Sequence, residues 1–202
     1  MTYVPITDAE IDVDSPVTQV LMTKYRDNIE FAVNPISTTV ITTAVASVDI
    51  TGFDASLYRS YKIELQNVKP AVANDNLFLR TSSDGGATFD DGGSNYSFTS
   101  YRVNTDGAAA AVGDDFTASP SLATAVGFST TDSGVSGTLS IQNPGASLKT
   151  MIGFNLYAAT SASALSSYGL VTRLENADVD AVRIFFNTRN IASGTIILWG
   201  IK

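Results

Sequence analysis

The sequence predicts a mainly β protein, an antiparallel β-sandwich of jelly-roll-like type preceded by an extended arm and one α-helix. Helical spacing of apolar residues occurs only between residues 15 and 35. From residue 37 onward the apolar residues alternate with a period of two, in about eight or nine runs separated by turn residues. No helical pattern falls between these runs, which favours antiparallel sheets. We therefore expect two domains, residues 1–36 and residues 37–202.

The N-terminal segment predicts an acidic arm followed by a helix. Ser15 is a favoured N-cap, Pro16 suits the first helical position, and Pro35 disfavours helical backbone at the residue before it. One face of this helix carries the apolar side chains of Val17, Val20, Leu21, Tyr25 and Ile29. A single apolar stripe must be covered by something, so we interpret the helix as an assembly element.

The rest of the chain predicts a series of strands. The clearest runs are residues 38–50, 60–68, 76–82, 96–103, 137–144, 151–158, 169–175, 181–187 and 194–202. The runs at 184–186 and 196–201 are apolar at successive positions. They indicate either central strands covered on both faces or a surface buried against another subunit. Residues 104–135 are rich in Gly, Ala and Ser, and we expect long loops there with one short strand.

The composition excludes several classes of function. The chain of 202 residues has no histidine and no cysteine, which excludes disulfide scaffolds, Cys/His zinc sites and Ser-His-Asp triads. Its formal net charge of −8 argues against nucleic acids and anionic membranes as partners. The first 15 residues have no basic region and no apolar region, and no run is long and apolar enough to span a membrane, so we expect neither a signal peptide nor a transmembrane helix. We expect no cofactor, no resident metal, no membrane insertion and no enzyme activity.

Four groups of residues are candidates for reactive or metal sites. The segment "SSDGGATF" (82–89) resembles an Asp-box hairpin and predicts a tight turn around Asp84. Oxygen ligands for Ca²⁺ could come from Asp84, Asp90, Asp91, Asp106, Asp114 and Asp115, but they lack EF-hand spacing. A glycosidase needs two converging carboxylates, and Glu64 and Glu175 are better read as solvated residues on strands. The arginines at 80, 102, 173, 183 and 189 are scattered along the sequence.

Tyrosines in loops are candidates for contact with sugars. Tyr58, Tyr96 and Tyr168 are expected to lie in loops or at strand ends, and we take them as possible glycan contacts. The alternative is that they fill the core of the sandwich or line its edges.

Two stretches resemble tail-fibre and small tail proteins of tailed bacteriophages. The first is "DAEIDVDSPVTQVLMTKYRDNIEFA", in which Asp12, Asp14, Ser15 and Pro16 form the acidic lead that would act as an anchor arm. The second is the β region, above all "NIASGTIILWGI" (190–201). The resemblance covers most of the chain except residues 104–135. It departs from the family in the helix, where "RDNIEFAVNP" places the proline later.

This resemblance implies a virion structural protein, made in the host cytoplasm and commonly trimeric. We expect a homotrimer whose N-terminus contacts other virion proteins and whose sandwich is displayed for recognition of a host surface glycan. One alternative is a capsid decoration, cement or head-fibre protein with a purely structural role. A polysaccharide-degrading enzyme is a third possibility, which would require converging carboxylates or an arginine cluster.

Overall fold

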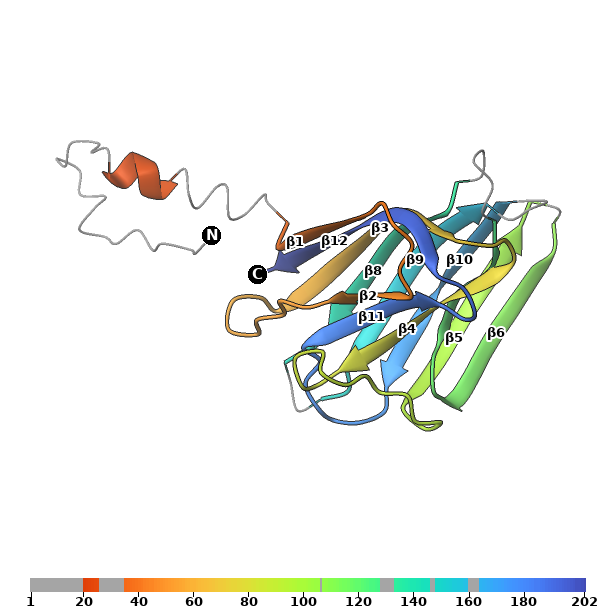
Figure 1. Ribbon diagram of the computed structural model, residues 1–202. Coiled ribbons are helices and arrows are strands. Elements are labelled where there is room, and N and C mark those ends of the chain that lie inside the picture. Colours follow the sequence, from red (N-terminus) through yellow and green to blue (C-terminus); the bar gives the residue numbers. More distant parts are fainter. Residues whose placement is uncertain (1–19, 26–34, 106, 128–132, 146–147, 160–163) are drawn as a thin grey trace. The chain divides into compact units, whose positions relative to one another are not determined.

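The computed structural model describes residues 20–25, 35–105, 107–127, 133–145, 148–159 and 164–202 (Figure 1). The chain divides into two compact units, Met1–Pro35 and Ile36–Lys202. In the first unit residues 20–25 are α-helical, which confirms the predicted helix over this segment. The other members of the predicted arm and stripe lie outside the described residues: Asp12, Asp14, Ser15, Pro16, Val17 and Ile29. No helix among the described residues is long and apolar enough to cross a membrane.

The second unit is built from strands that form two antiparallel sheets. In chain order the strands are β1 (Ser37–Ile41), β2 (Ser47–Ile50), β3 (Ser60–Pro70), β4 (Asp75–Ser82), β5 (Tyr96–Asn104), β6 (Ala109–Thr117), β7 (Ser121–Val126), β8 (Val135–Gln142), β9 (Met151–Ala159), β10 (Ala164–Arg173), β11 (Ala181–Phe186) and β12 (Ile191–Ile201). The large sheet has the order β1-β12-β3-β8-β9-β10-β5-β6, and the small sheet has the order β2-β11-β4-β7. The predicted antiparallel β-sandwich is confirmed.

The pairing of strands is nested along the chain. Strand β1 pairs with β12, β2 with β11, β3 with β8, and β4 with β7, so early strands meet late ones. Two further hairpins, β5–β6 and β9–β10, extend the large sheet beyond β8. Each hairpin is local in sequence, whereas the nested pairs bring together residues far apart in the chain.

The core lies between the two sheets and follows the alternation of side chains along each strand. In β3, Tyr61, Ile63 and Leu65 are buried, while Lys62 and Glu64 between them are only partly buried. Inward side chains of β8, β9, β4 and β11 complete this core, among them Leu139, Ile152, Leu77 and Ile184. A period of two therefore places one row of each strand in the core and the other on the surface.

Two strand assignments from the sequence were wrong. Residues 38–50 form two strands, β1 and β2, which lie in different sheets. Residues 104–135 contain β6 and β7, and also the first residue of β8. Strand β6 lies at the end of the large sheet and consists largely of Ala, Gly and Asp. Most of its side chains are exposed, so it carries no hydrophobic alternation that sequence analysis could detect.

The two strongly apolar runs prove to be central strands. Strand β11 lies between β2 and β4, and β12 lies between β1 and β3. Their outward aromatic side chains are partly covered by neighbours: Phe185 stacks on Phe78 at 5.9 Å between ring centroids, and the Lys62 ammonium lies 5.1 Å from the centre of the Trp199 ring. Both runs are therefore interior strands of their sheets, with outward side chains that are only partly covered within the described chain.

The two sheets differ in width, and this positions the candidate sites. Strand β7 forms one edge of the small sheet and contacts β9 and β10 of the large sheet. Strand β6 follows β5 at the end of the large sheet (Figure 1), and most of its side chains are exposed. The outward face of the large sheet therefore extends across all its strands, whereas the small sheet covers only part of its inner face.

Candidate functional site

The outward side of strands β8, β9, β10 and β5 forms a continuous surface, which we call the tyrosine face. It is defined by the outward side chains that alternate with the buried ones: Ser136, Thr138, Ser140, Gln142, Met151, Gly153, Asn155, Tyr157, Ser166, Tyr168, Leu170, Thr172, Ser97, Thr99, Tyr101 and Val103. The registers of the three strand pairs align these residues in rows across the sheet. Such a surface has fixed spacing because the backbone ladder holds it.

Three tyrosines dominate this face. Tyr101 and Tyr168 are opposite each other on β5 and β10, with their ring centroids 5.6 Å apart. Tyr157 lies one row away on β9, and Asn155 is opposite Tyr168 in the same row. The three tyrosines are 40%, 49% and 55% exposed in the order 101, 168 and 157. Their rings present both an apolar surface and a hydroxyl group to solvent.

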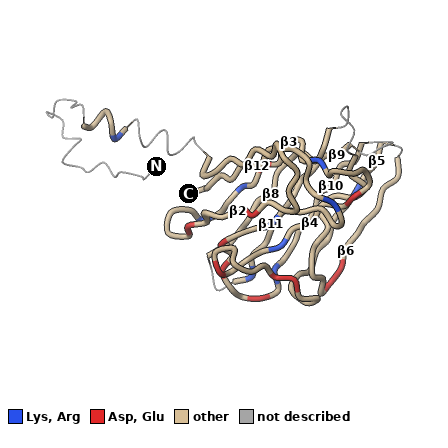
Figure 2. Tube along the Cα trace, in the orientation of Figure 1, with Lys and Arg blue, Asp and Glu red and all other residues tan. Residues whose placement is uncertain are grey.

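The tyrosine face carries no charged side chain, although the chain has 12 basic and 20 acidic residues. Figure 2 marks the charged residues along the described chain. Charges begin at its borders. At the border formed by β3, Nζ of Lys62 lies 3.8 Å from Oε2 of Glu64. At the border formed by β6, the Asp115 carboxylate accepts a hydrogen bond from the Ser97 hydroxyl. The polar groups on the face are hydroxyls and amides. A ligand for this surface therefore needs no charge of its own.

A pocket lies at one end of the face. Its volume is about 510 Å³, and one wall is a row across the sheet formed by Val103, Ser166, Tyr157 and Ser136. The remaining lining residues are Asn104, Thr105, Ser133, Gly134, Ala158, Ala159, Ala164 and Leu165. No lining residue is charged. Tyr157 belongs to both the pocket and the face, so the two form one connected site.

The structure places the three tyrosines predicted as glycan contacts in different environments. Tyr168 is exposed as expected, but it lies in the middle of β10 rather than in a loop. Tyr58 is partly buried, with its ring centroid 5.6 Å from that of Tyr61. The prediction for Tyr96 was wrong, because its side chain is wholly buried and is unable to contact a ligand at the surface.

Sequence reasoning missed Tyr101 and Tyr157, although the alternation of side chains could have found them. In the run at 96–103, Tyr96 faces the core and Tyr101 lies on the opposite side. In the run at 151–158, Ile152 and Leu156 are buried, which places Tyr157 outward. The relevant signal was therefore the parity of each position in its strand, rather than its expected location in a loop.

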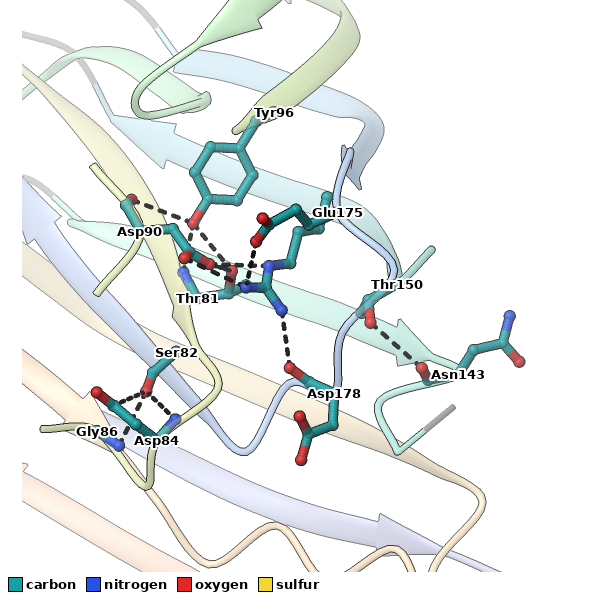
Figure 3. A network of polar contacts seen from close by, with 11 residues as sticks. Thr81, Ser82, Asp84, Gly86, Asp90, Tyr96, Asn143, Thr150, Glu175 and Asp178 are labelled. Atoms are coloured by element: carbon teal, nitrogen blue, oxygen red, sulfur yellow. Dashed lines mark hydrogen bonds and ion pairs between the residues drawn. The ribbon is translucent and has the colours of Figure 1, made fainter. Parts of the chain in front are cut away.

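Tyr96 belongs to a buried polar network around Arg173, and Figure 3 labels Tyr96, Thr81, Asp90 and other members of it. The Arg173 side chain is 1% exposed, and its Nε lies 2.9 Å from Oδ2 of Asp90. Its Nη1 donates to the carbonyl of Asp178 at 2.8 Å, and its Nη2 lies 3.4 Å from Oε2 of Glu175. This guanidinium therefore joins the end of β10 to the loops before β5 and β11.

The Tyr96 phenol completes the network. Its oxygen accepts a hydrogen bond of 2.7 Å from the backbone N–H of Thr81, and the Thr81 hydroxyl donates to Asp90 at 2.8 Å. Burial raises the pKa of Tyr96 to about 12, so the phenol stays neutral at ordinary pH. The polar groups here are occupied by one another, which makes the network a structural support rather than a ligand site.

The Asp-box segment forms the turn that the sequence predicted. The Asp84 carboxylate accepts hydrogen bonds from the Thr88 backbone N–H at 2.9 Å, from the Thr88 hydroxyl at 2.6 Å and from the Ser82 hydroxyl at 2.8 Å. These bonds, first those from Thr88, lower the pKa of Asp84 to about 2. Gly85 and Gly86 take positive φ values of 75° and 88°, which glycine adopts without strain.

The arginines do not converge. Arg80 donates to the Ser119 hydroxyl at 2.9 Å, while Arg183 makes bonds of 2.6 and 2.8 Å to the two oxygens of Asp49. Arg102 and Arg173 have other partners again, and Arg189 lies in an exposed turn. Among the described residues there is no group of three acidic side chains placed to share a metal ion. Glu64 is beside Lys62, and Glu175 is beside Arg173.

Comparisons with known proteins add no family. No family model matches the chain, and no curated protein sequence matches it. The candidate site is therefore argued from its own residues.

Replacing Asp90 by Ala should destabilise the sandwich strongly. The substitution leaves the buried Arg173 without its closest counter-ion, a change that typically costs about 3–5 kcal/mol. Asp91→Ala is the matched control, because the Asp91 side chain is 72% exposed and lies 3.9 Å from Arg80. We expect a cost of about 0–1 kcal/mol there. Urea unfolding followed by circular dichroism measures both, and equal losses would contradict this assignment.

Asp84 should make stability depend on pH in the acid range. Its pKa in the folded protein lies below the ordinary value of 3.8, so its stabilising contribution is present above that value and is lost as the pH falls through about 2. Asp84→Asn lacks this contribution at every pH. The difference in Tm between the two proteins should therefore narrow between about pH 4 and pH 2. A difference that stays constant from pH 6 to pH 2 would contradict the expectation.

Proposed function

We propose that this protein is a bacteriophage virion component that binds neutral host-surface glycans through the tyrosine face. The observation that supports this proposal is the combination of three exposed tyrosines with a complete lack of charge on that face. The C–H faces of sugar rings pack on aromatic rings, and their hydroxyl groups pair with hydroxyls and amides. Tyr101 and Tyr168 offer two neighbouring rings, and Asn155 offers an amide beside them.

The pocket next to Tyr157 extends this binding site. Its volume of about 510 Å³ falls within the range typical for pockets that hold small molecules. Hydroxyl groups of Ser133, Ser136 and Ser166 line it together with apolar carbon. We propose that a terminal sugar occupies the pocket while the following sugars lie on the tyrosine face. Binding then proceeds without breaking a bond.

We also infer that the sandwich is a jelly roll with two added hairpins. The nested pairs β1–β12, β2–β11, β3–β8 and β4–β7 have the order expected when one long hairpin folds over on itself. Double-sheet jelly rolls occur in viral capsid proteins and in lectin domains. The inserted hairpins β5–β6 and β9–β10 widen the large sheet and supply most of the tyrosine face.

Assembly into a homotrimer is part of the proposal. Val20, Met22 and Tyr25 are exposed in the helical segment, and apolar side chains on a helix are commonly covered by a partner. We propose that copies of the helix pack together and that the N-terminus docks on other virion proteins. Several sandwiches on one particle would then bind a glycan surface with an avidity far above that of one site.

A purely structural decoration protein is the second candidate. The tyrosine face also supports this candidate, because apolar side chains exposed on the face can be buried between copies of the protein. They are Tyr101, Val103, Met151, Tyr157, Tyr168 and Leu170. The two candidates differ in what occupies the face. If the face binds a glycan, replacing its tyrosines leaves the oligomeric state unchanged. If the face is an interface between copies, the same replacement changes the oligomeric state.

Replacing Tyr101 and Tyr168 by Ala should weaken glycan binding by about tenfold or more, since each ring removed is worth about 1 kcal/mol or more at a binding hot spot. A glycan array followed by calorimetry on the best neutral ligand measures the effect. Leu57→Ala is the control, an exposed apolar residue in the turn before β3, and it should leave affinity unchanged. Wild-type protein that binds no neutral glycan, or variants that dissociate the oligomer, would refute the assignment.

Placing a charge on the helical segment should dissociate the trimer. In Val20→Asp or Tyr25→Asp a carboxylate would have to be buried against other copies, which is costly without a partner charge. Light scattering of the purified full-length protein should give the mass of one chain for these variants and of three for the wild type. Thr23→Asp adds the same charge at a polar position as a control. A wild-type monomer at micromolar concentration would refute the trimer.

The location of the protein tests the virion assignment itself. Cryo-electron microscopy of purified particles should show the twelve-stranded sandwich on a capsid or a tail. If infected cells make the protein but the particles purified from them lack it, this part of the proposal is overturned.

A further inference from the structure

Near the β5–β6 end of the large sheet, a buried arginine has no counter-ion among the described residues. Arg102 projects from β5 on the side opposite the tyrosine face and is 8% exposed. Its Nη2 donates to the carbonyl and the hydroxyl of Ser121, at 2.9 and 3.1 Å, at the start of β7. Its Nε is buried and has no hydrogen-bond partner. In the part of the chain that the structure describes, no carboxylate forms an ion pair with it.

The Nε of the other buried arginine, Arg173, also lacks a well-directed hydrogen bond, but that guanidinium has carboxylates beside it. Arg173 has Asp90 at 2.9 Å, and Glu175 is also close to it. A buried charge is costly unless it is paired, and guanidinium remains protonated in proteins. Burial lowers the pKa of Arg102, in keeping with a cation that lacks compensation. Arg102 is thus a positive charge for which the described chain supplies hydrogen bonds but no anion.

A small pocket of about 200 Å³ adjoins this side chain. Its polar lining consists of Arg102, Asn104 and Thr124, and its apolar lining consists of Ala108, Ala109, Ala110, Val112 and Leu165. The lining contains a guanidinium, an amide and a hydroxyl group, all of which can donate hydrogen bonds, and it contains no carboxylate. The volume suits one small group rather than an extended ligand.

We propose that this pocket binds a small oxyanion, a carboxylate or a phosphate group, with Arg102 as its cationic ligand. Guanidinium matches the geometry of both groups because it donates two parallel hydrogen bonds to them. Asn104 and Thr124 can donate to the remaining oxygens. The anion could be free in solution or could be carried by an acidic sugar. This site is separate from the uncharged tyrosine face and does not depend on the function proposed for that face.

Thermal unfolding of the full-length protein tests the site. Inorganic phosphate, acetate and glucuronate are titrated at constant ionic strength, with glucose as the neutral control. A ligand that binds only the folded state raises Tm with a saturable dependence on its concentration, by about 3 °C at ten times its Kd. A rise in Tm with phosphate or acetate identifies a free oxyanion as the ligand. A rise in Tm with glucuronate only identifies an acidic sugar. No response to any of the three anions would overturn the proposal.

The variants separate this site from a general effect of salt. Arg102→Met should abolish the rise in Tm, measured from the variant's own baseline, and Arg80→Met should keep it. Ala110 is the residue directly opposite Arg102 on β6, so Ala110→Glu supplies a tethered carboxylate and should abolish the response without removing the arginine. Ala111→Glu is opposite Tyr101 and should retain the response. An equal rise in Tm in all four variants would overturn the proposal, whatever the stability of Arg102→Met.

Discussion

The large sheet has eight strands and the small sheet has four, so the small sheet can cover only part of the inner face of the large one. The rest of the structure depends on this mismatch. Strands β3, β8 and β9 contribute much of the core, whereas most side chains of β6, at the end of the large sheet, are exposed. The same width gives the molecule a broad outward face on which side chains stand in rows. Both proposed binding sites therefore arise from the hairpins that widen one sheet and not the other.

The two buried arginines show how one residue type serves two purposes. Arg173 is held among carboxylates and carbonyls of neighbouring loops, so its charge is neutralised within the fold. Arg102 is held by the carbonyl and hydroxyl groups of Ser121, which orient the guanidinium but leave its charge in place. A compensated charge supports the structure around it. An uncompensated charge attracts anions, and the pocket beside Arg102 gives a small anion access to it.

Much of the sandwich was predictable because strands such as β3 and β9 alternate strongly between core and surface. The turn around Asp84 was predictable for a similar reason, since its bonds are local. Strand β6 was not, because it pairs through its backbone and buries few side chains. The candidate site was predicted only at Tyr168. Tyr96 was misjudged because burial depends on which sheet covers a strand, and this is decided by residues far away in the sequence.

The nested pairing also determines when the sandwich can form. Strand β12 separates β1 from β3, and β11 separates β2 from β4, so an interior position of each sheet is filled by a strand near the C-terminal end of the sandwich. During synthesis the hairpins β5–β6 and β9–β10 can form early, but the sheets remain incomplete until β11 and β12 leave the ribosome. Such non-local pairing is slow and leaves strand edges open in the meantime. The nascent chain is thus most exposed to aggregation until β11 and β12 have been synthesised.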